Sequence, residues 1–158
     1  MRSASQIAKA LHEFASGYSV IGRKQDFFPM HVGVGKKVSF WLPMVLAVEQ
    51  QPHVIFVDPR RTKGLTKVGR RFAFSMMHER IRVADDDFAD VRLGIVRFQD
   101  NDEGDGRSVQ LYTDTGVELF SLDELESMVA DTYRIWQEVW EERTTETRRK
   151  GTGTGGLF

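Results

Sequence analysis

The stretch HVIFVDPRR, His53–Arg61, decides the fold prediction. Its apolar run predicts a buried central strand over 53–58, because a strand covered on both faces shows continuous rather than alternating apolar residues. Pro52 and Pro59 indicate where the strand begins and ends, since proline cannot donate a hydrogen bond within a ladder. Asp58 comes at the carboxyl end of the strand, where open α/β sheets bind ligands, or where an Asp–Pro pair simply caps the amides of a turn.

The segments that follow predict the rest of a single α/β domain, with mixed α+β as the alternative. Apolar residues recur at helical spacing over 64–81, so this segment is expected to form a right-handed crossover helix between parallel strands. The same residues also alternate as in a strand, and that alternative stays open. Residues 91–113 predict a hairpin, and 121–142 predict a long amphipathic C-terminal helix that begins with a capping box at Ser121 and Glu124.

The two ends of the chain are less regular. Residues 3–16 predict an N-terminal helix, and the glycine-rich stretch 18–37 allows only short, weak strands. Pro43 fits the first turn of a short helix. From 144 to 158 threonine, charged residues and glycine predominate, which favours a flexible tail behind a globular domain over 1–143.

The composition excludes several classes of protein. The chain has 158 residues, of which 41% are hydrophobic, and it has no cysteine, so disulfides, thiolate zinc sites and cysteine nucleophiles are excluded. A net charge of -1 provides no global attraction to nucleic acid or to an anionic membrane. No apolar run approaches the roughly 20 residues of a membrane-spanning helix. We therefore expect a soluble, cytoplasmic protein with no membrane partner.

Positive charge is nevertheless concentrated in one segment. Between Arg60 and Arg82 eight lysines and arginines stand against one acid, Glu79, whereas acids gather from Asp85 to Asp105. Arginine binds phosphate through two parallel hydrogen bonds, so a local basic face predicts a phosphate or polyanion site, most simply for nucleic acid. The residues expected to contact phosphate are Arg60, Arg61, Lys63, Lys67, Arg70, Arg71 and Arg80. The alternative is that the basic and acidic segments pack together and neutralise each other.

An enzyme is the second hypothesis. Asp58, His78 and Glu79 would have to converge near a bound phosphate, and a divalent metal such as magnesium would then be required; otherwise no cofactor is expected. The acid–proline pair at a strand end resembles the restriction-endonuclease-like nucleases, which place such an acid before a (D/E)xK motif on the next strand. Asp58 matches the first acid, but no lysine in the chain has an acid two residues before it.

Protein binding is the third hypothesis. Tyr133, Trp136 and Trp140 fall on one face of the predicted C-terminal helix, and aromatic residues of this kind anchor protein interfaces. The expected function is a nucleic-acid-associated factor, with nucleic acid as its first partner. The alternatives are an interaction subunit that binds another protein or a second copy of itself, and a divergent nuclease-like enzyme centred on Asp58.

Overall fold

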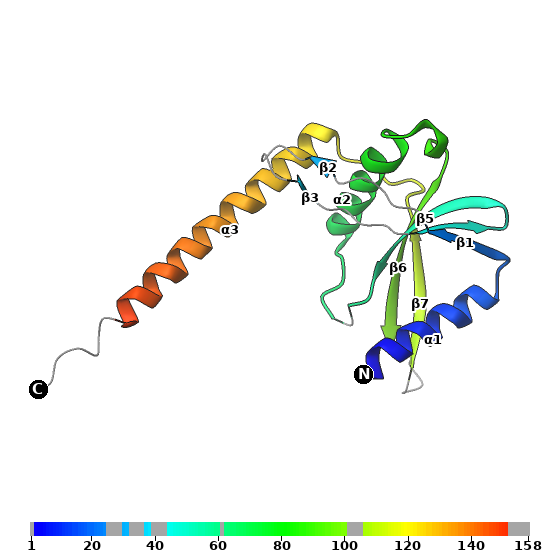
Figure 1. The fold of residues 1–158 in the computed structure, drawn as a ribbon, viewed down its shortest axis with the longest axis horizontal. Coiled ribbons are helices and arrows are strands. Elements are labelled where there is room, and N and C mark those ends of the chain that lie inside the picture. The colour runs from blue at the N-terminus through cyan, green and yellow to red at the C-terminus, as the bar shows by residue number, and fades with distance from the viewer. Residues whose placement is uncertain are drawn as a thin grey trace, which may run out of the picture.

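The strand predicted over 53–58 lies at the centre of the sheet (Figure 1). The computed structural model describes residues 2–24, 30–31, 37–38, 44–60, 62–100 and 106–151. Within these residues the predicted strand is β5, Gln51–Asp58, which pairs parallel with β6, Arg92–Asp100, and antiparallel with β4, Met44–Val48. A helical crossover joins β5 to β6, so the predicted mixed α/β fold of a single domain is confirmed.

The sheet contains five strands of the described chain in the order β1-β4-β5-β6-β7. Its edge strands are β1, Val20–Lys24, and β7, Arg107–Thr113, and each pairs antiparallel with its inner neighbour. The hairpin predicted over 91–113 is therefore present as β6 and β7. A separate two-stranded ladder joins β2, Met30–His31, to β3, Lys37–Val38.

Alternation along β5 divides the hydrophobic core between the two faces of the sheet. Val54 belongs to a buried cluster that includes residues of α2, Lys67–Met77. Ile55 points to the opposite face and packs in a second cluster with Ala10 of α1, Arg2–Ser16. The two helices thus cover opposite faces of one sheet.

The ambiguous segment 64–81 is helical. α2 begins after Thr66, whose hydroxyl accepts a hydrogen bond from the Gly69 amide at 3.0 Å and so caps the helix. It continues as η1, a π-helical turn over His78–Arg82, and a short 3-10 turn, η2, Asp86–Phe88, leads on to β6. The helical interpretation is confirmed and the strand alternative is wrong.

The predictions before β5 have different outcomes. α1 confirms the helix predicted over 3–16. The helix predicted from Pro43 is wrong where the structure describes that segment, because 44–48 forms β4 between β1 and β5. Val45 pairs with Val54 and packs on the α2 side of the core. Pairing with two neighbouring strands outweighs the local signal for a helix start.

α3, Leu122–Gly151, projects away from the sheet (Figure 1). Its capping box is formed, because the Ser121 amide donates to Glu124 Oε2 at 2.8 Å and the Glu124 amide donates to Ser121 Oγ at 3.3 Å. Residues 144–151, which by composition belong to the predicted tail, continue this helix, and 152–158 lie outside the described residues. α3 and the other described helices are too short or too polar to cross a membrane.

Candidate functional site

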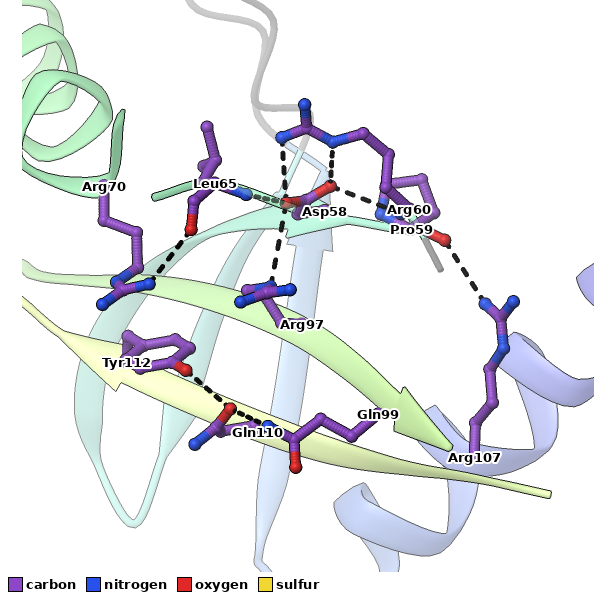
Figure 2. Close-up of polar contacts among 10 residues, drawn as sticks. All are labelled: Asp58, Pro59, Arg60, Leu65, Arg70, Arg97, Gln99, Arg107, Gln110 and Tyr112. Atoms are coloured by element: carbon purple, nitrogen blue, oxygen red, sulfur yellow. Dashed lines mark hydrogen bonds and ion pairs between the residues drawn. The ribbon is translucent and has the colours of Figure 1, made fainter. Parts of the chain in front are cut away.

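The carboxylate of Asp58 closes the turn that follows β5. Asp58 is 1% exposed and accepts hydrogen bonds from Arg60 Nε at 2.6 Å and Arg60 Nη2 at 3.0 Å. It also accepts from the backbone amides of Leu65 at 3.0 Å and Arg60 at 3.3 Å. Figure 2 shows these bonds converging on the one acid. Asp58 therefore holds the chain between β5 and α2 in place.

These hydrogen bonds also keep Asp58 ionised. Burial alone raises the pKa of its carboxyl group, but the hydrogen bonds from the Arg60 side chain and from the Leu65 and Arg60 amides outweigh burial, so the pKa lies below its ordinary value. The same pair raises the pKa of the Arg60 guanidinium. A general base works best with a pKa near the operating pH, and Asp58 is shifted away from that range. Its environment is that of a structural acid in a turn.

Two further arginines surround this turn (Figure 2). Arg97 of β6 lies opposite Asp58 in the parallel register, with its Nε 4.0 Å from Asp58 Oδ2. Arg107 of β7 donates from Nη1 to the carbonyl oxygen of Pro59 at 3.3 Å. Sequence reasoning misses both, although the parallel pairing that it predicts is the signal that places Arg97 beside Asp58.

Arg70 and Arg71 of α2 stack on aromatic rings. The guanidinium carbon of Arg70 lies 4.2 Å from the ring centroid of Tyr112, and Arg70 Nη1 donates to the carbonyl oxygen of Leu65 at 3.0 Å. The guanidinium carbon of Arg71 lies 3.8 Å from the ring centroid of Phe120. Such stacking is attractive because the ring face carries negative potential. Both cations, predicted to contact phosphate, hold α2 against neighbouring parts of the fold.

The other predicted phosphate contacts do not share one environment. Lys63 and Lys67 are exposed. Arg80 is partly buried in η1, and burial lowers the pKa of its guanidinium. Arg61 lies outside the described residues. The described members of the basic segment therefore divide between internal contacts and solvent.

The predicted catalytic residues do not converge. The amide of Leu65, two residues before α2, is bonded to Asp58, whereas His78 and Glu79 follow the last residue of α2. Because α2 has 11 residues, it separates the two ends of the crossover by roughly 16 Å. Among the residues that the structure describes, no group of three or more His, Cys, Asp or Glu is placed to hold a metal ion.

α3 presents an aromatic face to solvent. Val129, near the start of the helix, is buried against Met76 of α2. Farther along the same side of α3, Tyr133, Trp136 and Trp140 are 38%, 63% and 56% exposed. Their spacing keeps them on one side of a helix in line with Val129. We refer to Tyr133, Trp136 and Trp140 as the aromatic face.

Glutamates predominate on the side of α3 away from the aromatic face. Glu138, Glu141, Glu142 and Glu146 follow one another there at helical spacing. Acidic side chains repel phosphate, whereas exposed tryptophans suit an apolar protein surface. A mixed α/β domain with internally bonded arginines and a projecting aromatic helix thus presents a surface better suited to protein than to phosphate.

Comparison with known proteins identifies the family. A family model described as "Sliding clamp-binding bacterial toxin SocB" matches residues 1–146. The DNA replication inhibitor toxin SocB of Caulobacter vibrioides (strain NA1000 / CB15N) is 35% identical over 148 residues, which are 94% of this chain and 62% of that relative. The chain therefore belongs to the SocB family, and it spans less than two thirds of the length of the relative. No solved structure matches.

The prediction of a phosphate-binding, nucleic-acid-associated factor is wrong. The family is described by a protein partner, the sliding clamp. A count of charges along 60–82 does not reveal that Arg60 is paired with Asp58, or that Arg70 and Arg71 lie on aromatic rings. The alternative of an interaction subunit that binds another protein agrees with this description of the family.

Proposed function

We propose that this chain binds a bacterial sliding clamp and inhibits DNA replication by occupying it. The observation that carries the proposal is the family match over residues 1–146, which includes the sheet and the aromatic face of α3. The 35% identity to a replication inhibitor toxin supports the same activity. The proposed action takes place in the cytoplasm and requires no catalytic group in this chain.

The aromatic face is the surface of the chain best suited to hold the clamp. Tryptophan and tyrosine dominate the binding energy of many interfaces, because each buries a large apolar area with few rotatable bonds. Trp136 and Trp140 already expose more than half of their surface, at 63% and 56%. A partner can therefore cover them without any rearrangement of the core.

Biolayer interferometry on immobilised sliding clamp from the same bacterium tests the proposal. Wild type should bind, and Trp136→Ala/Trp140→Ala should weaken binding by at least about 30-fold, since a hot-spot aromatic residue contributes roughly 2 kcal/mol or more. The matched control Glu141→Ala/Thr145→Ala alters the opposite side of the same helix and should bind as wild type does. If wild type fails to bind, the proposed function is wrong; if the tryptophan variant binds normally, another surface holds the clamp.

A replication assay separates clamp binding from toxicity. Wild type should slow primer extension by a polymerase that depends on the clamp, and it should leave extension by a clamp-independent polymerase unchanged. The tryptophan variant should lose inhibition in proportion to its loss of clamp binding. Equal inhibition of both polymerases would show that the chain acts on DNA or on the polymerase, contrary to the proposal.

A further inference from the structure

The sheet face that carries α1 is only partly covered. A sheet of five strands is roughly 24 Å wide, whereas one helix covers roughly 10 Å. α1 packs toward the β6–β7 side, where Ala10 meets Val96 and Phe98 in a cluster that also includes Val109. On these dimensions a second helix fits beside α1 over β4 and β5.

The space beside α1 is an apolar cavity of about 520 Å³. Phe14, Ala15 and Tyr18 form one wall, and side chains of β4 and β5, including Leu46 and Val48, form the floor. The rings of Phe14 and Tyr18 pack in a tilted arrangement with their centroids 5.2 Å apart, which stabilises that wall. We refer to this space as the α1 groove.

α3 complements the groove, because part of its apolar face packs against no other element among the described residues. Leu125 and Val129 pack against α2, but the aromatic face farther along the helix is exposed. An isolated helix segment is marginal in water, because most helical stability in proteins comes from packing of an apolar face. The floor of the α1 groove is apolar and can therefore accept the apolar face of a helix. Trp136 and Trp140 have side chains large enough to fill the groove.

The α3 of the same copy is unsuited to this groove. Its first turns pack against α2 and therefore start on the face of the sheet opposite α1. From there α3 runs as one continuous helix of 30 residues away from the sheet (Figure 1). We propose that this chain forms a two-fold dimer in which the aromatic face of each copy docks in the α1 groove of the other.

Charge and area both favour a second copy as the occupant. Of the described residues that line the groove, Glu49 is the one with a full charge, and Arg143 lies one helical turn beyond Trp140. An arginine on the docking helix is thus available to pair with an acid at the rim of the groove. At their present exposure the three aromatic residues of two copies bury roughly 600 Å² in all. The two grooves bury somewhat less, so the total approaches the roughly 1,200 Å² of the smallest stable interfaces.

The dimer has a consequence that rests on the proposed function. The aromatic face offered to the clamp is the face that the dimer hides, so a chain in the dimer cannot bind the clamp through it. Self-association then holds the inhibitor in an inactive form, and dilution or a high clamp concentration releases it by mass action. Groove variants that prevent dimerisation should therefore raise the apparent affinity for the clamp.

Solution mass measured by sedimentation equilibrium tests the dimer. Wild type should approach twice its chain mass of 18.1 kDa as concentration rises. Trp136→Ser/Trp140→Ser removes the docking helix face, while Ala15→Arg fills the groove from a helical position; both should remain monomeric with unchanged circular dichroism. Tyr18→Lys is a second groove variant at a site that is already 44% exposed, so it is expected to fold.

Mixing the variants provides the decisive observation. The Trp136→Ser/Trp140→Ser variant has an intact groove, and the Ala15→Arg variant has an intact aromatic face. The mixed dimer therefore retains one of the two contacts, in which the aromatic face of the Ala15→Arg copy docks in the groove of the other copy. The mixture should form dimers that neither variant forms alone, although more weakly than wild type. A wild type that stays monomeric, or groove variants that dimerise as the wild type does, would each overturn the proposal.

The clamp measurement keeps the two proposals distinguishable. If the dimer forms but no variant binds the clamp, the dimer stands and the proposed function fails. If the wild type binds the clamp and stays monomeric, the proposed function stands and the dimer fails. In the expected case, Ala15→Arg binds the clamp at least as tightly as wild type does.

Discussion

Arg60 Nε lies 2.6 Å from Asp58 Oδ1, and this pair closes the turn between β5 and α2. The two partners contribute unequally to the turn, because the side chain of Asp58 is 1% exposed and that of Arg60 is 49% exposed. The acid also accepts from the Leu65 amide, so its loss leaves backbone as well as side-chain donors unsatisfied. When Arg60 is removed, water can reach Asp58 and replace much of the hydrogen bonding that the guanidinium supplied.

Asp58→Asn should therefore lower the free energy of unfolding by about 2 kcal/mol, because a neutral amide is a weaker acceptor and its NH₂ group faces other donors. Arg60→Ala should cost less than about 1 kcal/mol, since its side chain is half exposed. Urea denaturation measures both values. Equal losses of unfolding free energy in the two variants would contradict the conclusion that Asp58 contributes more to the turn than Arg60 does.

The loss of stability at acidic pH should depend on Asp58. Folding lowers the pKa of Asp58, so its carboxylate stabilises the folded state fully at pH values above the unfolded pKa of roughly 3.9. That contribution is lost as the pH falls through the still lower folded-state pKa. Urea midpoints between about pH 2 and pH 6 should fall less steeply for Asp58→Asn than for wild type. Parallel curves would show that Asp58 has the same pKa in both states.

Sequence alone predicts the elements of this fold whose signals are local. The apolar run of β5 and the capping box at Ser121 and Glu124 both appear in the structure. β4 is missed because its strand character comes from pairing with β1 and β5, which a local pattern does not contain. The prediction of a phosphate site is wrong for the same reason. Arg70 contacts the ring of Tyr112, and Arg71 contacts the ring of Phe120, only in the folded chain.

Breaking the Arg82–Asp114 ion pair should greatly lower the stability of the fold. Arg82 Nη1 lies 2.7 Å from Asp114 Oδ2, and the two side chains are only 17% and 11% exposed. Asp114→Ala should lower the free energy of unfolding by about 3 kcal/mol, because it leaves a mostly buried guanidinium without its acid. The exposed Arg134–Glu138 pair is the matched control, and Glu138→Ala should leave the free energy of unfolding almost unchanged. Similar losses at both sites would refute this account.

Ser75 links α2 to the start of α3. Its buried hydroxyl donates to the Arg71 carbonyl oxygen at 2.8 Å and accepts from the Phe120 amide at 2.8 Å. Ser75→Ala should cost about 1–2 kcal/mol, since it leaves the Phe120 amide without its acceptor. Thr132→Ala removes an exposed hydroxyl on α3 and should cost almost nothing. Amide hydrogen exchange should be faster at Phe120 in Ser75→Ala; unchanged exchange would show that this bond does not restrain the start of α3.

The two-residue turn between β4 and β5 should be improved by glycine. Val48 pairs with Gln51, which leaves Glu49 and Gln50 as the turn residues, with φ angles of 50° and 70°. Positive φ at both positions is typical of a type I′ turn, in which glycine and asparagine are favoured because side chains with a full Cβ are strained there. Gln50→Gly should therefore raise the free energy of unfolding by about 1 kcal/mol, or the melting temperature by roughly 2–4 °C. The control Gln51→Gly places the same residue in a strand without positive φ and should lower stability by a similar amount. A loss of stability in Gln50→Gly would show that the glutamine side chain makes a contact worth more than the backbone strain.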